Sequence, residues 1–529
     1  MSTRNTKRKQ TSVYRLAKPV QKGFFGLLFS RFMVVLLLIL LQLSAYIVGF
    51  VLLEVYLPNF AVIRAIFLVA MVIYLFNCPM DSSAKLTWLL IISLFPIPGA
   101  LVLAFSRTAL GYRKLRKNVN EQVEATKKAI PKDRSVLQEL KRDGSGTDDL
   151  SRYLNRSGCF PIFNNTEATY YPSGEAFFED MLKELDRAEK YIFLEYFIIE
   201  EGYMWGEILQ ILHRKAKEGV DVRVMYDGLC EISQLPTGYT DLLAEHKIRA
   251  KVFAPIHARL STHYNYRDHR KILAIDGKVA FTGGVNLADE YINQIERFGH
   301  WKDTAVRLRG AAAKSLTLMF LQMWNLDEEH PLYEPYLDDE GYVPDGANGY
   351  VMPYCDTPMD DMRVGETVYI DMLYRATDYV HIMTPYLILD DELKTALTYA
   401  AQRGVDVKLI LPGIPDKKGA YALAKSHYRD LLQAGVKIYE YTPGFVHAKV
   451  VIADGNKAVV GTINMDYRSL YHHFECAAYL YKTSCIPEIE ADYLETLKKC
   501  RTVSRDTIRR EKLSVKIRGS LMKFIAPLM

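Results

Sequence analysis

Residues 269–286 read HRKILAIDGKVAFTGGVN, and residues 447–464 read HAKVVIADGNKAVVGTIN. Each stretch begins His-x-Lys, continues after four residues with Asp, and after six more reaches a turn of small residues that ends in Asn. A single His-x-Lys carries a high false-positive risk, but two copies with the same gaps are very improbable by chance. The recurrence indicates a duplicated unit that contributes one histidine per copy.

The segments around the two motifs also repeat. The apolar run at 191–199 (YIFLEYFII) is matched by that at 379–389 (YVHIMTPYLIL), and 219–226 (GVDVRVMY) is matched by 404–411 (GVDVKLIL). Short apolar runs of this kind are typical of buried strands, and the sequence between them has helical spacing. The long period excludes a solenoid. The pattern therefore predicts an α/β fold made of two duplicated halves with mixed or parallel sheets covered by helices.

Composition shifts along the chain predict its organisation. A very apolar beginning is followed by a polar connector, two mixed halves separated by an acidic linker rich in Pro, Gly and Asp, and a basic end. The predicted segments are an N-terminal membrane region (1–117), a connector (118–158), a first half (159–327), a linker (328–349), a second half (350–500) and a basic amphipathic tail (501–529).

Three apolar segments lie in the first of these regions, at 33–53, 60–76 and 86–105. Only the middle one carries a charge, Arg64, and the last contains two prolines. Basic residues flank the set on both sides, so the positive-inside rule places both ends in the cytoplasm and requires an even number of crossings. We therefore predict a multi-pass cell-membrane protein with two crossings and cytoplasmic catalytic halves, in which one segment enters the membrane without crossing it.

The charge distribution and the cysteines restrict the partners. The net charge of +5 is modest for 529 residues, whereas a nuclease should show a more obvious basic groove. Basic chain ends beside apolar segments favour anionic lipid headgroups instead. The seven cysteines form no C-x-x-C pair, which indicates reduced thiols and no zinc site.

The motif residues suit a phosphate group. Residues two apart in a strand share a face, so His269 and Lys271 point the same way, as do His447 and Lys449. Lysine supplies a compact positive charge to a phosphate oxyanion, and asparagine amides add neutral donors. The two Asp-Gly pairs are typical of turns, so we interpret their aspartates as structural. The candidate phosphate-binding amides are Asn286 and Asn464, and the turn aspartates are Asp276 and Asp454.

At these residues the chain resembles the phospholipase D superfamily, whose motif HxKxxxxD, followed by a small-residue turn and Asn, occurs twice per active site. The resemblance implies that the two halves form one site. One histidine attacks phosphorus and forms a covalent phosphohistidine, and the other acts first as general acid and then as general base. It implies neither cofactor nor metal. The motif assigns His269, Lys271, Asp276, His447, Lys449 and Asp454 to the catalytic set.

A catalytic imidazole needs a partner on its second nitrogen, and in the family a nearby strand supplies a carboxylate. Glu475 lies in a strand-like run 28 residues after His447, and Asp303 occupies the analogous run of the first half. We therefore expect each carboxylate to orient the histidine of its own half. Two-motif members of the family commonly use the first histidine as the nucleophile, so we predict His269 as the nucleophile. We predict His447 as the general acid, because an imidazole that is firmly paired with a carboxylate holds its proton more readily.

Other segments are similar to the bacterial cardiolipin synthase branch, namely FLEYFII (193–199), GHWKDT (299–304), TPYLILDDEL (384–393), GTINMDYRSL (461–470) and the end of the chain. There, Leu513, Ile517, Leu521, Ile525 and Leu528 form a helical stripe with Lys516, Arg518 and Lys523 among them. The resemblance implies that two phosphatidylglycerols are joined into cardiolipin with release of glycerol. Its implied partners are phosphatidylglycerol, other anionic phospholipids and the membrane, without nucleic acid.

Three other functions stay open at this point. A phosphatidylserine synthase or a hydrolytic phospholipase D of the same superfamily would carry the same motifs. A membrane scaffold with a silent enzyme fold is a non-enzymatic alternative, which the presence of both histidines, both lysines and both asparagines disfavours. Oligomeric state and acceptor choice do not follow from the sequence.

Overall fold

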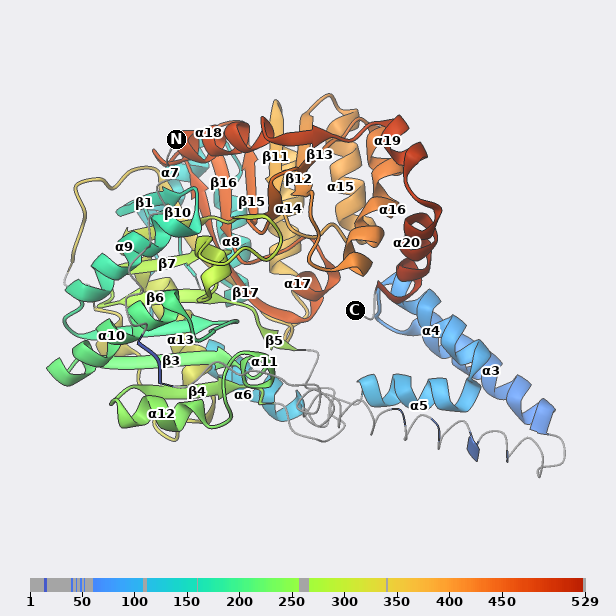
Figure 1. Ribbon diagram of the computed structural model, residues 1–529, viewed down its shortest axis with the longest axis horizontal. Coiled ribbons are helices and arrows are strands. Elements are labelled where there is room, and N and C mark those ends of the chain that lie inside the picture. Colours follow the sequence, from blue (N-terminus) through green and yellow to red (C-terminus); the bar gives the residue numbers. More distant parts are fainter. Residues whose placement is uncertain are drawn as a thin grey trace, which may run out of the picture.

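The protein is described here from a computed structural model. It describes residues 60–107, 112–158, 160–255, 266–338 and 341–526, together with 14–16, 40, 44, 48, 49 and 52. Two β-sheets lie side by side in the body of the molecule, and a group of N-terminal helices projects from one end (Figure 1).

The first sheet belongs to the first half of the chain. Its strands are β1 (Thr166–Tyr171), β2 (Tyr191–Tyr196), β3 (Asp221–Asp227), β4 (Arg249–Phe253), β6 (Lys271–Ile275), β7 (Val279–Gly283) and β9 (Ala305–Gly310), in the order β1-β9-β7-β6-β2-β3-β4. Helices α9 (Gly174–Arg187), α10 (Tyr203–Glu218), α11 (Cys230–Ser233) and α12 (Tyr239–Glu245) and the 3-10 turn η2 (Asp289–Ile292) connect them.

The second sheet repeats this order. Its strands are β10 (Tyr350–Asp356), β11 (Tyr379–Met383), β12 (Asp406–Pro412), β13 (Lys437–Tyr441), β15 (Val450–Ala453), β16 (Lys457–Gly461), β17 (His473–Tyr481) and β18 (Cys500–Thr502), in the order β10-β17-β16-β15-β11-β12-β13-β18. Its helices are α14 (Val364–Arg375), α15 (Asp391–Gln402), α16 (Lys418–Ala434), α17 (Tyr467–Tyr471) and α18 (Ile486–Leu497). The matching orders confirm the predicted duplication.

Local sequence explains how the repeated helices begin and end. The Ser173 side chain accepts a hydrogen bond from the Ala176 amide at the start of α9, and Asp390 accepts one from Leu393 at the start of α15. Such caps satisfy amides that have no partner inside the helix. Helix α10 ends at Gly219 and α16 at Gly435, both in the left-handed conformation that glycine adopts readily. Each helix therefore turns back sharply into the next parallel strand.

Helix α13 (Ala313–Trp324) joins the two halves from the inside. Every residue of this helix except Lys314 is buried, which is typical of a helix surrounded by protein on all sides. It contacts strands of both sheets, including β6 and β10. One continuous apolar core therefore contains side chains from both halves, such as Phe193 and Val459. The turns η3 (Asn325–Asp327) and η4 (Glu334–Tyr336) lead from α13 to β10.

The residues between the N-terminal region and the first half are helical and packed. Helices α6 (Tyr112–Ala125), α7 (Arg134–Asp143) and α8 (Thr147–Gly158) contribute Val119, Val136, Leu140 and Leu154 to the core of the body. The predicted connector at 118–158 is thus an integral layer of the fold. The packing of this segment is hard to predict from the sequence, because its buried residues lie about one helical turn apart and charged residues stand between them.

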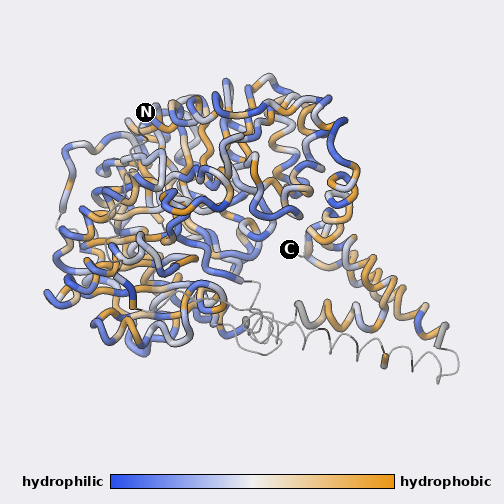
Figure 2. Tube along the Cα trace, in the orientation of Figure 1, coloured by the Kyte–Doolittle hydropathy of each residue, from blue (hydrophilic) through white to orange (hydrophobic). Residues whose placement is uncertain are grey.

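Three apolar helices precede this layer: α3 (Phe60–Asn77), α4 (Ser82–Leu94) and α5 (Pro96–Arg107) (Figures 1 and 2). The predicted single segment at 86–105 is broken at Phe95, because Pro96 starts a new helix. Among the described residues, no helix combines the length and the apolar character needed to cross a membrane. The predicted segment at 33–53 lies mostly outside the described residues, and the two crossings stay a prediction.

The C-terminal tail packs against the second half. Helices α19 (Arg505–Arg510) and α20 (Leu513–Ile525) follow β18 and lie beside α16. In α20, Gly519 is buried so closely against α16 that a Cβ there would lie 2.4 Å from the Ala422 carbonyl oxygen. The apolar stripe predicted in the tail is exposed from Leu513 to Ile525. Leu528 lies outside the described residues.

Replacing Leu154 by alanine tests whether α6–α8 belong to the folded body. Leu154 is fully buried, so removing its side chain is expected to reduce the free energy of unfolding by about 2–5 kcal/mol, measured by chemical denaturation of the full chain. Lys141→Ala, on the exposed side of α7, is the control and should change little. Equal stability of the two variants would show that these helices are only a connector.

Candidate active site

His269 is positioned by a strand of the opposite half. The short strand β5 (Arg267–Asp268) pairs in parallel with β17, so that Arg267 lies opposite His473 and Asp268 opposite Phe474. The His269 amide continues this pairing and donates to the Phe474 carbonyl over 2.9 Å. The first motif histidine is therefore fixed by the backbone of the second half.

His447 is positioned by the reciprocal arrangement. Strand β14 (Gly444–Val446) pairs in parallel with β8 (His300–Lys302) of the first half. The His447 amide then donates to the Lys302 carbonyl over 2.7 Å. In both cases the residue after the accepting carbonyl is a carboxylate, Asp303 in the first half and Glu475 in the second.

The two histidine–carboxylate pairs cross between the halves. His269 Nδ1 lies 3.0 Å from both carboxylate oxygens of Glu475, and His447 Nδ1 lies 2.7 Å from Asp303 Oδ2. The prediction that each carboxylate orients the histidine of its own half is therefore wrong. The prediction assumed that a histidine pairs with the carboxylate nearest to it along the chain. The parallel pairings β5–β17 and β14–β8 instead bring each histidine to the carboxylate of the other half.

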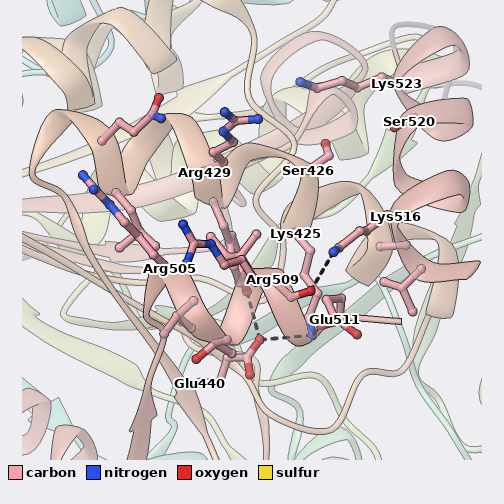
Figure 3. Close-up of a pocket in the computed structure, with 18 residues that line it drawn as sticks. Lys425, Ser426, Arg429, Glu440, Arg505, Arg509, Glu511, Lys516, Ser520 and Lys523 are labelled. Carbon is pink, nitrogen blue, oxygen red and sulfur yellow. Dashed lines mark hydrogen bonds and ion pairs between the residues drawn. The ribbon is translucent and has the colours of Figure 1, made fainter. Parts of the chain in front are cut away.

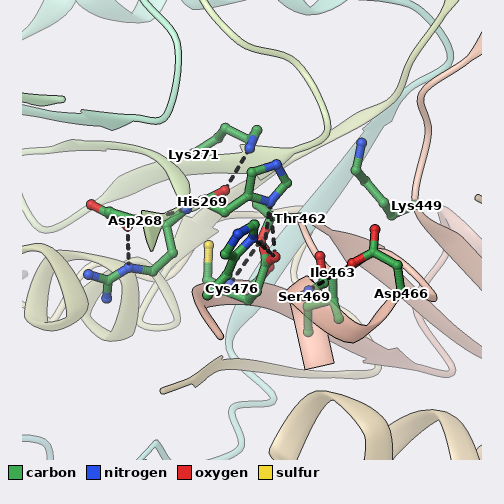
Figure 4. A network of polar contacts seen from close by, with 12 residues as sticks. Asp268, His269, Lys271, Lys449, Thr462, Ile463, Asp466, Ser469 and Cys476 are labelled. Carbon is green, nitrogen blue, oxygen red and sulfur yellow. Dashed lines mark hydrogen bonds and ion pairs between the residues drawn. The ribbon is translucent and has the colours of Figure 1, made fainter. Parts of the chain in front are cut away.

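Both lysines of the motifs are buried beside the histidines. Lys271 Nζ donates to the His269 carbonyl over 2.6 Å, and Lys449 Nζ lies 2.9 Å from His447 Nδ1. Lys271 and Lys449 come from different halves and lie on either side of the His269 ring (Figure 4). Burial lowers the pKa of Lys271 to about 8 and that of Lys449 to about 7.

The two sets of residues share one electrostatic environment. Burial is the largest cause that holds the pKa of His269 well below its usual range, and the charge of Lys271 is the next largest. Lys449 and His447 of the other half lower this pKa further. Burial lowers the pKa of His447 to about 4, with Lys449 acting in the same direction and Asp303 against it. Both rings are therefore neutral at pH 7 in the free site, where a bound anion would favour their protonated forms.

The two carboxylates differ although their positions correspond. Burial raises the pKa of Glu475 well above its usual range, and Lys271 and Thr462 offset this only in part. Burial also acts on Asp303, but the charge and hydrogen bond of His447 outweigh it and hold the pKa of Asp303 below its usual value. His447 thus has the more strongly anionic partner.

The small-residue turns explain part of this difference. Gly284 of the first turn corresponds to Thr462 of the second. A Cβ at Gly284 would lie 2.0 Å from Asp303 Oδ1, so only glycine leaves room for that carboxylate. At the corresponding place the Thr462 hydroxyl donates to Glu475. The turn thus shapes each carboxylate site separately.

The two asparagines are buried but differ in their bonding. Asn286 Nδ2 donates to the Tyr291 hydroxyl over 2.7 Å, and its Oδ1 accepts from the Ile198 amide over 3.2 Å. Asn464 Oδ1 has no hydrogen-bond partner among the described residues. Asn286 therefore supports the surrounding backbone, whereas Asn464 retains an unused polar group for a ligand.

The motif aspartates lie at the far ends of β6 and β15 from the histidines. Asp276 accepts hydrogen bonds of 2.8 Å from the amides of Glu189, Lys190 and Tyr191, at the start of β2. Asp454 accepts in the same way from the amides of Thr377, Asp378 and Tyr379, the last of which is the first residue of β11. Their positions agree with the structural interpretation, since both fix the edge of the neighbouring strand.

His473 is a site residue that the sequence reasoning missed. It precedes Glu475 by two residues in β17, and its ring centroid lies 5.2 Å from that of His269. Ligand atoms of His269, His473 and Glu475 lie within 4.8 Å of one another, a grouping that could hold a metal ion. Because His269 is 206 residues from Glu475 along the chain, no ligand spacing in the sequence could reveal it.

The arrangement suits transfer of a phosphoryl-type group. Two imidazoles have their Nδ1 atoms held by carboxylates, which leaves each Nε2 for reaction. Two buried lysines provide positive charge for phosphate oxygens, and the unpaired Asn464 Oδ1 can accept a hydrogen bond from a substrate hydroxyl. One imidazole can attack phosphorus while the other handles the proton of the alcohol.

Comparisons with known proteins agree with this chemistry. The pattern of the family described as "Cardiolipin synthase, PLD-like domain" matches residues 181–324 and 369–497. The chain is 57% identical to an uncharacterized protein of Streptococcus mutans over 87% of this chain and 100% of that one. It is 34% identical to a cardiolipin synthase of Alkalihalophilus pseudofirmus (84% of this chain, 89% of that one) and 35% identical to cardiolipin synthase 2 of Bacillus cereus (88% and 90%).

A solved structure supports the fold alone. The phosphatidylserine synthase of Haemophilus influenzae superposes with a TM-score of 0.56 at 15% identity, and the match covers 72% of this chain and all of that one. The family match covers both halves, including both histidine motifs and both partner carboxylates. The chain therefore belongs to the cardiolipin synthase family of phospholipase D-like proteins.

Proposed function

We propose that the protein is a cardiolipin synthase, which transfers a phosphatidyl group from one phosphatidylglycerol to another and releases glycerol. The observation that carries the proposal is the crossed pair of histidines, each held by a buried carboxylate of the other half. Family relatives that are named cardiolipin synthase and match most of the chain support the substrate class. Phosphatidylglycerol and cardiolipin are lipids, so the enzyme acts at the cell membrane.

In the first step, His269 is the nucleophile. Its Nδ1–H donates to Glu475, and its Nε2 lone pair forms a bond to phosphorus as the bond from phosphorus to the glycerol oxygen breaks. In the substrate complex the anionic phosphate and Asp303 favour the protonated form of His447, which takes up a proton from solvent as the substrate binds. Protonated His447 then transfers its Nε2 proton to the glycerol oxygen, so glycerol leaves as a neutral alcohol. Lys271 and Lys449 offset the negative charge of the phosphate oxygens.

In the second step, His447 takes the proton from a hydroxyl of the second phosphatidylglycerol. The hydroxyl oxygen attacks phosphorus, and the phosphorus–nitrogen bond breaks to restore His269. The roles differ because Asp303 is anionic and favours a protonated His447, as a general acid requires. The sequence also predicts His447 as the general acid, but with Glu475 as its partner. In the structure the partner of His447 is Asp303.

Product analysis tests the proposed function. Purified protein with radiolabelled phosphatidylglycerol in detergent is expected to form cardiolipin and glycerol in equal amounts. Phosphatidic acid as the main product would identify a hydrolase. Formation of phosphatidylserine from a nucleotide-activated lipid and serine, without cardiolipin, would identify the other transferase. No product with any of these substrates would favour a scaffold protein.

The roles of the two histidines can be separated with a substrate whose leaving group needs no proton. Asp303→Asn is expected to slow glycerol release from phosphatidylglycerol by about 100-fold or more, the range that general acid catalysis contributes. The burst of p-nitrophenolate from a phosphatidyl p-nitrophenyl ester should be much less affected, because p-nitrophenolate leaves unprotonated. Glu475→Gln should slow both, since it misorients the nucleophile.

Mapping the covalent adduct completes this test. With the p-nitrophenyl ester and rapid quenching in cold denaturant at mildly alkaline pH, where the phosphorus–nitrogen bond survives, mass spectrometry of peptides should place the phosphatidyl group on His269. An adduct on His447, together with the opposite response of the two carboxylate variants, would reverse the roles and leave the two-step chemistry intact.

The pKa values of the lysines predict the alkaline limit of activity. Lysine loses its positive charge as pH rises through its pKa, which is about 7 for Lys449 and about 8 for Lys271. The value of kcat/KM for phosphatidylglycerol, which reports the free enzyme, should therefore fall more steeply above this range than His447 alone would make it fall. Lys449→Arg, which keeps its charge, should move the fall to higher pH. A flat profile from pH 6 to 9 would contradict this assignment.

Metal independence stays a prediction, and His269, His473 and Glu475 make it worth testing. Activity is expected to be unchanged after exhaustive treatment with EDTA, because the proposed steps use only protein groups. His473→Asn, which removes one possible ligand, should not introduce a dependence on added divalent ions. Loss of activity in EDTA that a divalent ion restores in the wild type only would show that the three residues hold a catalytic metal.

A further inference from the structure

A basic pocket lies between α16, α19 and α20, on the second half and separate from the histidine site (Figure 3). Its volume is about 670 Å³. Six cationic side chains line it, against two carboxylates, Glu440 and Glu511. The cations are Lys425, Arg429, Arg505, Arg509, Lys516 and Lys523.

The two carboxylates are already neutralised from within the protein. Glu440 is buried and bonded to Arg501, and Lys425 lies between Glu440 and Glu511 and pairs with both. Lys516 Nζ donates to the Arg509 carbonyl over 2.9 Å, which ties α20 to α19. The charged groups on the floor of the pocket are therefore paired with one another.

The cations at its rim are not neutralised in this way. Arg429 and Arg505 are exposed and form no hydrogen bond or ion pair with the part of the chain that the structure describes. Lys523 is also exposed and projects from α20 toward the same opening (Figure 3). Three cations from three helices thus surround one opening, where a doubly or singly charged phosphate would find donors on several sides.

Helix α20 places an apolar surface next to this rim. At about 100° per residue, Lys516, Ser520 and Lys523 occupy the strip between the face packed on α16 and the outer face. The outer face carries Leu513, Ile517, Leu521 and Phe524, which are 72%, 52%, 61% and 55% exposed. One helix therefore offers both a cationic strip and an apolar strip, a combination that suits a lipid–water interface.

The apolar strip continues onto the N-terminal helices. The Thr87 hydroxyl of α4 donates to the Phe524 carbonyl over 2.6 Å, which joins α4 to α20. Leu86, Leu90 and Leu94 of α4 are themselves exposed. The tube coloured by hydropathy shows the apolar α3 and α4 running outward from the point of contact (Figure 2). Exposed apolar area of this extent marks an interaction surface.

We propose that the pocket binds the phosphate of an anionic phospholipid at a bilayer surface, with the acyl chains beside the apolar strip of α20. The lipid bound there is not a substrate, because no group of the histidine site lines the pocket. The site would hold the second half against the bilayer and fix the orientation in which lipids reach the histidines. It does not depend on which transfer or hydrolysis the histidines perform.

Binding of a short-chain phosphatidylserine, added as monomer to the full-length protein in neutral detergent, tests the proposal by calorimetry. Arg429→Gln/Arg505→Gln/Lys523→Gln should weaken binding at least about tenfold, because it removes the three cations that surround the opening and would bind the phosphate. The matched control Lys128→Gln/Lys183→Gln/Lys217→Gln removes the same charge from exposed sites elsewhere and should bind as the wild type does. Equal weakening in both variants would overturn the proposal.

Two further arms identify the ligand. Ile517→Ser/Leu521→Ser should weaken binding of the lipid but not of inorganic phosphate, and hydrogen exchange of residues 505–526 should slow on binding the lipid. Phosphate that binds as tightly as the lipid would make the pocket a site for a soluble anion. Phosphatidylcholine that binds equally well would show no selection for charge. Either result would refute the proposal.

Turnover of dispersed phosphatidylglycerol by the pocket variants separates this proposal from the proposed function. These variants should turn over the dispersed substrate at the wild-type rate and lose activity only on vesicles. A protein inactive toward every lipid substrate could still bind phosphatidylserine in the pocket. Equal loss of activity on both forms of substrate would show instead that the tail supports the histidine site.

Discussion

The exchange of short parallel strands between the halves fixes the active site. Residues 267–269 extend along β17, and residues 444–447 extend along β8, so each histidine amide is bonded to the strand that carries its carboxylate partner. Neither half alone contains a motif histidine together with its partner carboxylate. Rigid placement matters here, because buried imidazole–carboxylate pairs offset their desolvation only when the geometry is good. The continuous core around α13 maintains that geometry.

A duplicated scaffold that has diverged at a few positions can give its two histidines different chemistry. Gly284 and Thr462 occupy corresponding turns, yet one makes room for Asp303 and the other donates to Glu475. The pKa of Asp303 is consequently lowered and that of Glu475 raised. Groups whose environments push their pKa values apart suit different steps of proton transfer. The His473 ring adds to the asymmetry, since it lies beside His269 only.

The cations of the histidine site differ from those at the rim of the pocket in their physical properties. Lys271 and Lys449 are buried, and burial lowers their pKa values. They can therefore respond to the charge of a bound phosphate and to pH. Arg429, Arg505 and Lys523 are exposed at the rim of the pocket between α16, α19 and α20. The first kind suits chemistry, and the second suits attraction of an anionic surface.

The amino-acid sequence alone predicts the duplicated α/β fold, the two motif histidines and lysines, and both partner carboxylates. These follow from strand periodicity, repeated gaps and the matching of DTAVRL (303–308) with ECAAYL (475–480), all of which are local along the chain. For residues 118–158 the sequence predicts only a connector, because their buried positions are sparse among charges. The pairing of each carboxylate with its histidine depends on the folded chain, which also brings His473 beside His269 and gathers six cations into one pocket. The physical reason is that pairing between strands far apart in the chain joins residues whose separation in sequence carries no information about their contact.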